Sequence, residues 1–381
     1  MAVLADNGIS WTVQTVDEKG QRYGNGYIPI VLDSSNNPHI AYTVFDYPPY
    51  TYAIVSYASW NGSGWTTQII EEYKTAYSLT LDADDNPHIL YGGESLIYAS
   101  WTGTNWYNQT VDENGGGYGV VVLDSSGNPN IAYTNGQVLK YANWTGDGWD
   151  IQTLDTFDGI PFFLSFALDP NNTPYILYTA ESSKLAVYDV TSWNIQTVYD
   201  LSGIEGFESM ALDSEGYPHF IYKELYGDPT TRHLEYVSWN GAAWTAQTVD
   251  PDVSYNRAFL ALDSHDYPHI SYISDYPEQL MYAYWTGTVW NIQTVGNSTA
   301  DSSSYLALDT NDYPHISFRF QPRPDARLWP IMYATATINA EPTEPPSTTF
   351  SDSTLLLISA IVIAVTTVAI VYVWKRHRSS S

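Results

Sequence analysis

The side chains best suited to chemistry in this chain recur at a fixed spacing. A Leu-Asp pair returns seven times, and a proline follows each leucine after six residues; the aspartates are Asp33, Asp82, Asp124, Asp169, Asp213, Asp263 and Asp309. In five copies a histidine follows the proline, at His39, His88, His219, His269 and His315. Carboxylates and imidazoles are common ligands of calcium and zinc, so the first hypothesis raised by the repeat is metal binding.

The repeat pattern argues against that hypothesis. A calcium loop needs several oxygens that converge on one cation, and only the copy with Asp82, Asp84 and Asp85 approaches that density. An Asx-type turn, in which the carboxylate accepts backbone N–H groups between two strands, suits every copy. If the repeats are arranged in a ring, equivalent histidines in different repeats lie too far apart to bind one ion. The sequence therefore predicts structural turns and structural histidines, with no metal or other cofactor.

Six residues outside the repeat are the candidates for ligand binding: Arg22, Tyr27, Tyr118, Glu208, Arg257 and Arg319. Tyr27 and Tyr118 each lie five residues before a repeated leucine, and Arg257 takes the same place in the sixth copy. Variable residues on a rigid scaffold are the usual place for ligand recognition. If the repeats form a ring around a central channel, we expect these side chains near the mouth of that channel. The sequence contains no P-loop, dinucleotide fingerprint, zinc-protease helix or nucleophile elbow, and no catalytic residue is assigned.

A second repeated signal places these residues on strands. Aromatic residues five apart flank a turn, and five of these pairs are Trp60 with Trp65, Trp101 with Trp106, Trp144 with Trp149, Trp239 with Trp244, and Trp285 with Trp290. The second member of each pair opens an alternating, partly β-branched run that is typical of a strand. In the first repeat we expect strands over residues 27–32, 39–43, 53–60 and 65–70. Four strands in about 45 residues are the pattern of a β-propeller blade.

The two ends of the repeat region predict how the ring closes. The last repeat lacks a tryptophan-led fourth strand, and a matching run from Trp11 to Val16 precedes the first repeat. The N-terminal strand should therefore complete the last blade and remove two open sheet edges. The fold prediction is an all-β, seven-bladed β-propeller over residues 10–338. Its Leu-Asp strands are expected to be innermost, with the variable loops on the face opposite the Leu-Asp turns.

The C-terminal segment predicts a membrane anchor. Residues 339–353 are rich in proline, serine and threonine and are typical of a stalk. Residues 354–374 form an uncharged, mostly apolar run, long enough at about 1.5 Å per residue to cross a bilayer as a helix. The basic residues in 375–381 place the C-terminus in the cytoplasm and the propeller outside the cell. Export needs a signal peptide, so we favour a truncated start over a tail-anchored protein that faces the cytosol.

The composition restricts the expected partners. The chain carries 14 Lys and Arg against 42 Asp and Glu, a formal net charge of -28, so few cations are available to neutralise the phosphates of a nucleic acid. It contains no cysteine, which removes disulfide and thiol chemistry. We expect a glycan or a surface protein as the partner of a monomeric propeller.

The Leu-Asp-x4-Pro-His-Ile and Trp-x-Gly-x-x-Trp motifs resemble the repeat propellers of prokaryotic, especially archaeal, cell-surface proteins, loosely grouped with sialidase-like propellers. The resemblance covers about residues 10–338, and the Asp-box of sialidases is not present. It implies a surface protein that binds a glycan or protein through its variable-loop face. Two alternatives stay open: a structural envelope protein, and a sialidase-like glycoside hydrolase or lyase. A hydrolase would need two carboxylates about 5 to 10 Å apart across the channel mouth. We favour binding over catalysis.

Overall fold

The structure is a computed structural model, and it describes residues 5–6, 9–19, 27–45, 52–158, 163–179, 182–198, 204–225, 232–254, 257–274, 278–295, 300–320 and 329–338. The chain divides into two compact units, Met1–Ile338 and Asn339–Ser381. The predicted stalk, membrane span and basic tail, at residues 339–353, 354–374 and 375–381, lie outside the described residues. Among the residues that are described, no helix has the length and apolar character needed to cross a membrane.

The first unit consists of seven antiparallel sheets, which we number as blades in chain order. Blade one holds β3 (Ile30–Leu32), β4 (Pro38–Phe45), β5 (Ala53–Trp60) and β6 (Trp65–Glu72). Blade two holds β7 (Thr75–Leu81), β8 (Pro87–Gly92), β9 (Leu96–Trp101) and β10 (Trp106–Asp112). Blade three holds β11 (Gly119–Leu123), β12 (Pro129–Asn135), β13 (Val138–Trp144) and β14 (Trp149–Thr156). Blade four holds β15 (Phe163–Leu168), β16 (Pro174–Thr179), β17 (Ser183–Tyr188) and β18 (Trp193–Thr197).

The remaining blades follow the same order. Blade five holds β19 (Ile204–Leu212), β20 (Pro218–Leu225), β21 (Arg232–Trp239) and β22 (Trp244–Asp250). Blade six holds β23 (Phe259–Leu262), β24 (Pro268–Ile273), β25 (Leu280–Trp285) and β26 (Trp290–Thr294). Blade seven holds β27 (Ala300–Leu308), β28 (Pro314–Phe320), β29 (Ile331–Ile338) and, from the other end of the unit, β2 (Ile9–Asp17), to which the short β1 (Ala5–Asp6) is paired.

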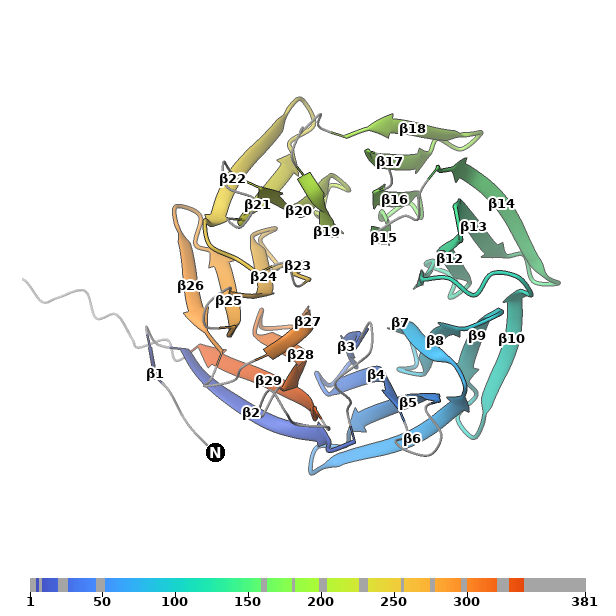
Figure 1. The fold of residues 1–381 in the computed structure, drawn as a ribbon, viewed down its shortest axis with the longest axis horizontal. Coiled ribbons are helices and arrows are strands. Elements are labelled where there is room, and N and C mark those ends of the chain that lie inside the picture. The colour runs from blue at the N-terminus through green and yellow to red at the C-terminus, as the bar shows by residue number, and fades with distance from the viewer. Residues whose placement is uncertain are drawn as a thin grey trace, which may run out of the picture. The chain divides into compact units, whose positions relative to one another are not determined.

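The blades are arranged as a closed ring (Figure 1). The seven Leu-Asp strands β3, β7, β11, β15, β19, β23 and β27 contact one another in sequence, and β27 returns to β3. The outer strand β2 pairs with β29 along its length, from Ile9 opposite Ile338 to Asp17 opposite Ile331. The predicted seven-bladed propeller and its closure by the N-terminal strand are therefore confirmed.

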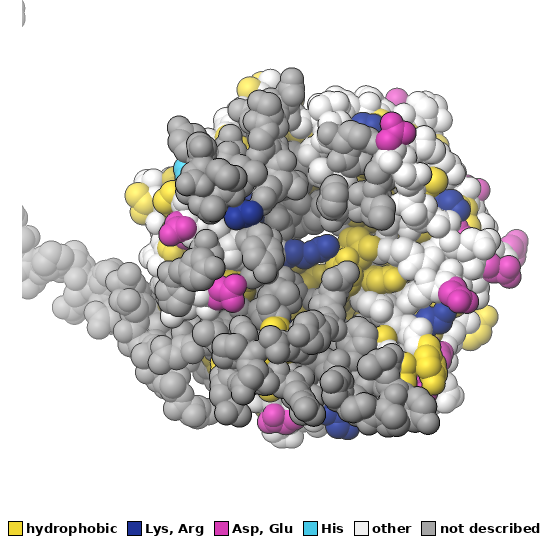
Figure 2. Space-filling view, in the orientation of Figure 1, with side chains coloured by type: hydrophobic (Ala, Val, Ile, Leu, Met, Phe, Trp, Pro, Cys, Tyr) yellow, Lys and Arg dark blue, Asp and Glu magenta, His cyan; other side chains and the backbone are white. Residues whose placement is uncertain are grey.

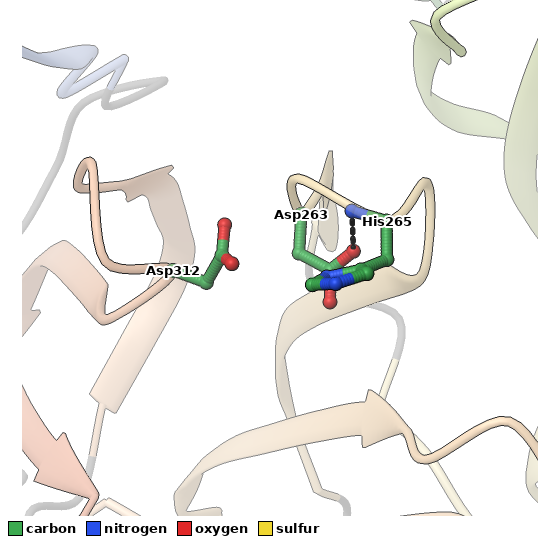
Figure 3. A group of neighbouring side chains, drawn as sticks. All are labelled: Asp263, His265 and Asp312. Atoms are coloured by element: carbon green, nitrogen blue, oxygen red, sulfur yellow. Dashed lines mark hydrogen bonds between the residues drawn. The ribbon is translucent and has the colours of Figure 1, made fainter.

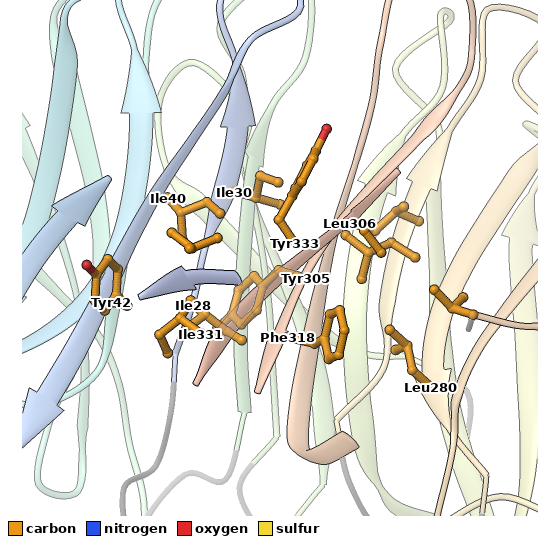
Figure 4. Packing of buried hydrophobic residues seen from close by; sticks show 14 of the residues in the cluster. Ile28, Ile30, Ile40, Tyr42, Leu280, Tyr305, Leu306, Phe318, Ile331 and Tyr333 are labelled. Carbon is orange, nitrogen blue, oxygen red and sulfur yellow. The ribbon is translucent and has the colours of Figure 1, made fainter. Parts of the chain in front are cut away.

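The hydrophobic core lies mainly between blades rather than within one blade. At the joint of blades seven and one, residues from β2, β3, β4, β28 and β29 form one cluster, part of which is drawn in Figure 4. The second strand of a blade is buried on both faces, as in Pro268–Ile273, where every residue is buried. A short continuous apolar run of this kind is typical of a strand covered on both sides. Each blade is therefore stabilised by its neighbours.

Candidate functional site

The repeated aspartates close the turns between the first and second strands. In all seven copies Oδ1 accepts the backbone N–H groups of the residues two and four positions later, at 2.7 to 3.0 Å. Burial alone would raise the pKa of Asp33, but the hydrogen bonds from Asn37 and Ser35 lower it below its usual value. The predicted Asx-type turn is confirmed.

The repeated histidines join each turn to the third strand of the blade. In the five blades with histidine, Nδ1 lies within hydrogen-bond distance of a tyrosine hydroxyl, from Tyr57, Tyr98, Tyr236, Tyr282 and Tyr333 in blade order. Nε2 faces the turn aspartate at 3.3 to 3.8 Å. In blade three, Asn130 takes the histidine's place and accepts the Tyr141 hydroxyl at 2.5 Å. These five histidines have structural partners, as predicted.

The turns of neighbouring blades also form hydrogen bonds with one another across the boundary between two blades, which we call a seam. We call this contact the seam latch: the Ser or Thr after the aspartate donates to an Asn or Asp side chain in the next blade's turn. Ser34 donates through N and Oγ to Asp85 at 2.9 and 2.6 Å, and equivalent pairs are Ser125 with Asn172, Ser214 with Asp266, Ser264 with Asp312, and Thr310 with Asn36. At the other two seams the equivalent positions hold Ala83 and Gly127, and Pro170 and Gly216. These residues lack the side chains that form the latch.

One latch brings together a group that resembles a metal site. Ligand atoms of Asp263, His265 and Asp312 all lie within 4.8 Å of one another (Figure 3). The carboxylates already have partners, because Asp263 accepts the His265 backbone N–H at 2.8 Å and Asp312 accepts both hydrogen bonds from Ser264. The turn and the latch explain this proximity, so we assign these side chains to the scaffold.

Two of the predicted ligand-binding residues meet at the ring axis. Tyr27 precedes β3 and Tyr118 precedes β11, and their rings stack with centroids 4.3 Å apart at 13°. Tyr77 of β7 contacts both rings edge-on, at 5.8 and 5.9 Å. Its hydroxyl donates to the Gly116 carbonyl at 2.8 Å. Blades one, two and three thus supply a three-ring aromatic platform.

Arg257 reaches this platform from blade six. Its guanidinium carbon lies 4.8 Å from the Tyr27 ring centroid and 5.6 Å from that of Tyr118. Its Nη2 donates to the Tyr27 hydroxyl at 3.3 Å. A guanidinium over an aromatic face is attracted by the ring quadrupole. We call Tyr27, Tyr77, Tyr118, Arg257 and the neighbouring Tyr305 the axial cluster; basic and apolar side chains lie side by side near the centre of Figure 2.

Tyr305 forms the buried part of the cluster. Its ring stacks on Phe259 at 3.7 Å, and its side chain interacts electrostatically with Tyr118 and Arg257. The residue is 7% exposed, and its buried hydroxyl has no hydrogen-bond partner among the described residues. Burial raises the pKa of Tyr305 and of Tyr118, and Arg257 only partly opposes the rise at Tyr118. Both hydroxyls therefore stay protonated at neutral pH, as hydrogen-bond donors rather than bases.

Of the other predicted site residues, only Arg319 has a described side chain. Arg319 of β28 is only 1% exposed, and its Nη2 donates to the Thr43 carbonyl of β4 at 3.3 Å across the joint of blades seven and one. Its charge also acts on Tyr305 of the axial cluster, so Arg319 lies close to that cluster but is buried beneath the surface. Glu208 is in β19, but its side chain lies outside the described residues, as does all of Arg22.

The sequence prediction missed Tyr77, Tyr305 and Phe259. Tyr77 lies four residues before its repeated leucine instead of five, and the ladder between β7 and β8 shifts register between Ala76 and Ser78. A bulge of this kind re-aims a side chain. Glu208 occupies the same place in β19, where the ladder shifts between Phe207 and Ser209. An alignment of repeats that allowed one extra residue would have grouped Tyr77 with Tyr27 and Tyr118.

Solved structures of known proteins share this fold at low sequence identity. Virginiamycin B lyase from Staphylococcus aureus matches with a TM-score of 0.58 and 11% identity, over 85% of this chain and 99% of that one. An ulvan lyase from a family of polysaccharide lyases matches with a TM-score of 0.56 and 11% identity, over 84% and 95%. YCF48, solved with a D1 peptide, matches with a TM-score of 0.54 and 12% identity, over 88% and 96%.

At the level of sequence, no family model matches this chain, and neither does any curated protein. Identities of 11 to 12% support the propeller fold alone. The resemblance to archaeal-type surface propellers therefore stays a prediction. What the comparisons establish is that this chain is similar to β-propellers, among them lyases and a propeller solved with a bound peptide.

Proposed function

We propose that this protein is a ligand-binding propeller whose axial cluster recognises a glycan that ends in a single acidic sugar. The observation that carries the proposal is Arg257 lying over the stacked rings of Tyr27 and Tyr118. The edges and outer faces of stacked rings are an apolar contact surface for a ring-shaped ligand, and a guanidinium attracts a carboxylate through charge-assisted hydrogen bonds. At the axis, several blades can contribute residues to one site, as blades one, two, three and six do here.

The charge of the whole chain narrows this ligand class. A formal net charge of -28 repels polyanions, although salt screens the repulsion beyond about 8 Å at physiological ionic strength. One carboxylate on an otherwise neutral sugar chain can reach Arg257 without carrying many charges toward the acidic surface. A sulfated or polyuronic chain would meet much stronger repulsion.

The protonation of the cluster favours binding over catalysis. A lyase or hydrolase of this site would need a group that takes a proton at neutral pH, and the raised pKa of Tyr118 and Tyr305 keeps these hydroxyls protonated, so they cannot accept one. Two of the similar propellers are lyases, so an enzyme remains the second candidate, with Glu208 as the residue to examine. YCF48 bound to a peptide supports the broader class of binding propellers.

We further propose that residues 354–374 anchor the protein in a membrane with the propeller outside the cell. The support is the uncharged apolar run followed by Lys375, Arg376 and Arg378. Protease added to intact cells should remove the propeller and leave the basic tail protected. Protection of the propeller instead would support the tail-anchored orientation.

A glycan array tests the binding proposal. The array should contain neutral glycans, glycans with one terminal acidic sugar, and polyanionic chains, and each bound glycan should then be incubated with the protein and inspected for cleavage. We expect retention of single-acid glycans without cleavage. Cleavage would favour the lyase or hydrolase, and no binding to any glycan would favour a protein ligand or a structural envelope role.

A further inference from the structure

The seam between blades four and five lacks a contact that the other six seams share. At those six seams, the tryptophan that opens an outer strand packs against a tyrosine on the third strand of the preceding blade. The pairs are Trp11 with Tyr282, Trp65 with Tyr333, Trp106 with Tyr57, Trp149 with Tyr98, Trp193 with Tyr141, and Trp290 with Tyr236. All six are edge contacts, with ring centroids 5.0 to 5.6 Å apart.

At the exceptional seam, leucine replaces this tyrosine. The equivalent position is fixed by register, because Tyr141 pairs with Gln152 and Leu185 pairs with Gln196 in the next blade. The histidine that would bond the tyrosine hydroxyl is also replaced, by Tyr175. Trp244 of blade five instead contacts Phe220 of its own blade at 5.1 Å. The seam latch is missing here too, because Pro170 faces Gly216.

A cleft of about 420 Å³ lies where the tyrosine ring would be. Leu185 and Tyr175 line it from blade four, and Trp239 and Trp244 line it from blade five. Its volume falls within the range of about 300 to 1,000 Å³ that is typical of ligand sites. Asn194 and Gln196 of the outer strand β18 also line the cleft and are exposed to solvent, so it opens on the outer wall of the ring.

We propose that this cleft, which we call the seam cleft, binds a tyrosine side chain of a partner polypeptide. The other six seams indicate which group this cleft lacks, because in each of them a tyrosine ring packs against the tryptophan in the equivalent place. A cavity left by a missing ring can take up a separate aromatic molecule of similar shape. The primary amides of Asn194 and Gln196 each offer a donor and an acceptor, which suits the N–H and C=O groups of a peptide backbone.

This site is separate from the axial cluster. The seam cleft opens between the outer strands β18 and β22, and the axial cluster lies on the inner strands. The two proposals therefore fail independently. Loss of Arg257 should leave the seam cleft unchanged, and filling the seam cleft should leave glycan binding unchanged.

A methyl NMR titration of the full chain tests the proposal. The probe is the blocked pentapeptide Gly-Gly-Tyr-Gly-Gly, compared with the same peptide carrying serine, with 4-methylphenol and with methyl glucoside. We expect the tyrosine peptide to shift the methyl signals of Leu185, Val187 and Val198, and 4-methylphenol to shift the same signals with affinity at least about tenfold weaker. Shifts from methyl glucoside or the serine peptide alone, from 4-methylphenol without the tyrosine peptide, or from no probe would overturn the proposal.

Two variants locate the binding. The double variant Leu185→Tyr with Tyr175→His restores the repeat, so it should fill the cleft, raise Tm and abolish the shifts caused by the tyrosine peptide. The variant Tyr236→Leu opens the equivalent place between blades five and six and should gain a second binding site for the peptide. Continued binding to the filled variant at unchanged affinity would show that the peptide lies elsewhere and would refute the assignment.

Discussion

At the scale of single residues, the same side chains that suggest catalysis turn out to hold the blades together. An imidazole between a hydroxyl and a carboxylate is the arrangement of a nucleophile with its base and orienting acid. Here it occurs in five blades, with the tyrosine and histidine buried and the carboxylate engaged by its own turn. Repetition around the ring, rather than convergence on one cleft, marks the arrangement as structural.

The buried histidines should make stability depend on pH. Burial lowers the pKa of His39, His88, His219 and His315, and the facing aspartates only partly oppose it. The unfolded chain therefore binds more protons than the folded chain once the pH falls below 6.5, the ordinary value for histidine. We expect stability to be highest above that pH and to decline as the pH falls toward the lowered pKa of the folded state.

Urea unfolding between pH 5 and pH 8 measures this effect. Replacing these four histidines by asparagine, the residue that blade three uses at the same position, should reduce the slope in that range. The turn carboxylates Asp33, Asp82 and Asp263 contribute only at lower pH, because hydrogen bonds within the turns lower their pKa values below the ordinary 3.8. A slope that is unchanged in the fourfold variant would contradict the assignment.

At the scale of elements, the contacts that vary are those between blades. Each blade repeats its turn geometry, but the seam latch is present at five seams and replaced by small or cyclic residues at two. The acceptor position in the turn has a positive φ, at 64° for Asn172 and 80° for Gly127. Asparagine and aspartate tolerate this conformation better than other residues with a side chain, which explains why they alternate with glycine there.

A missing latch can therefore be added at the seam of blades two and three. A Cβ placed on Gly127 would meet no atom within 4 Å, so Gly127→Asn should fit. Together with Ala83→Ser it recreates the pair that Ser125 and Asn172 form at the next seam. We expect the double variant to gain about 1 kcal/mol in free energy of unfolding, the usual net worth of a hydrogen bond.

The two single variants serve as the controls for this prediction. Each alone supplies half of the latch and should change the free energy of unfolding by less than the pair does, which chemical denaturation can resolve. Additive effects of the two substitutions would show that no latch forms.

Local sequence patterns predicted the strands and turns of each blade, but they did not predict the contacts between blades. The spacing of Leu32, Pro38 and Trp60, repeated along the chain, was enough to predict four strands, the turn chemistry and the blade number. The burial of Arg319 was not predicted, because it donates to the Thr43 carbonyl, 276 residues away in sequence, and no local pattern encodes such a contact. The missing tyrosine at Leu185 could not be predicted, because leucine is an ordinary core residue. Only the strand register reveals that Leu185 takes the place of the tyrosine found at the other seams.

At the scale of the whole molecule, the strand from the N-terminus joins the first and last blades. Trp11 of β2 is 3% exposed, packs edge-on against Tyr282 of blade six and belongs to the cluster at the joint. Without β2, strand β29 would present an unpaired edge, which is a template for association with another chain. The ring is thus held closed by a segment more than 300 residues from its partner strand.

Trp11→Ala should destabilise the whole ring rather than one blade. We expect a loss of about 3 to 5 kcal/mol in free energy of unfolding, the usual cost of removing a buried tryptophan. Removal of residues 1–17 should in addition cause oligomers to form, which light scattering would detect. Trp60→Ala is the matched control, because its side chain is only partly buried and should cost less. Equal costs for both would contradict the special role of the closing strand.

The measurement that tests the proposed function most directly is a calorimetric titration with one glycan in two forms, with its terminal carboxylate intact and with that group reduced to an alcohol. Arg257→Gln should weaken binding of the acidic form by about 10- to 100-fold, or about 1.4 to 2.8 kcal/mol, and change binding of the neutral form little. Lys19→Gln, which removes the same charge from an exposed position after β2, should leave both affinities unchanged. Equal losses for the two glycan forms, or unchanged binding in Arg257→Gln, would contradict recognition of an acidic sugar at the axial cluster.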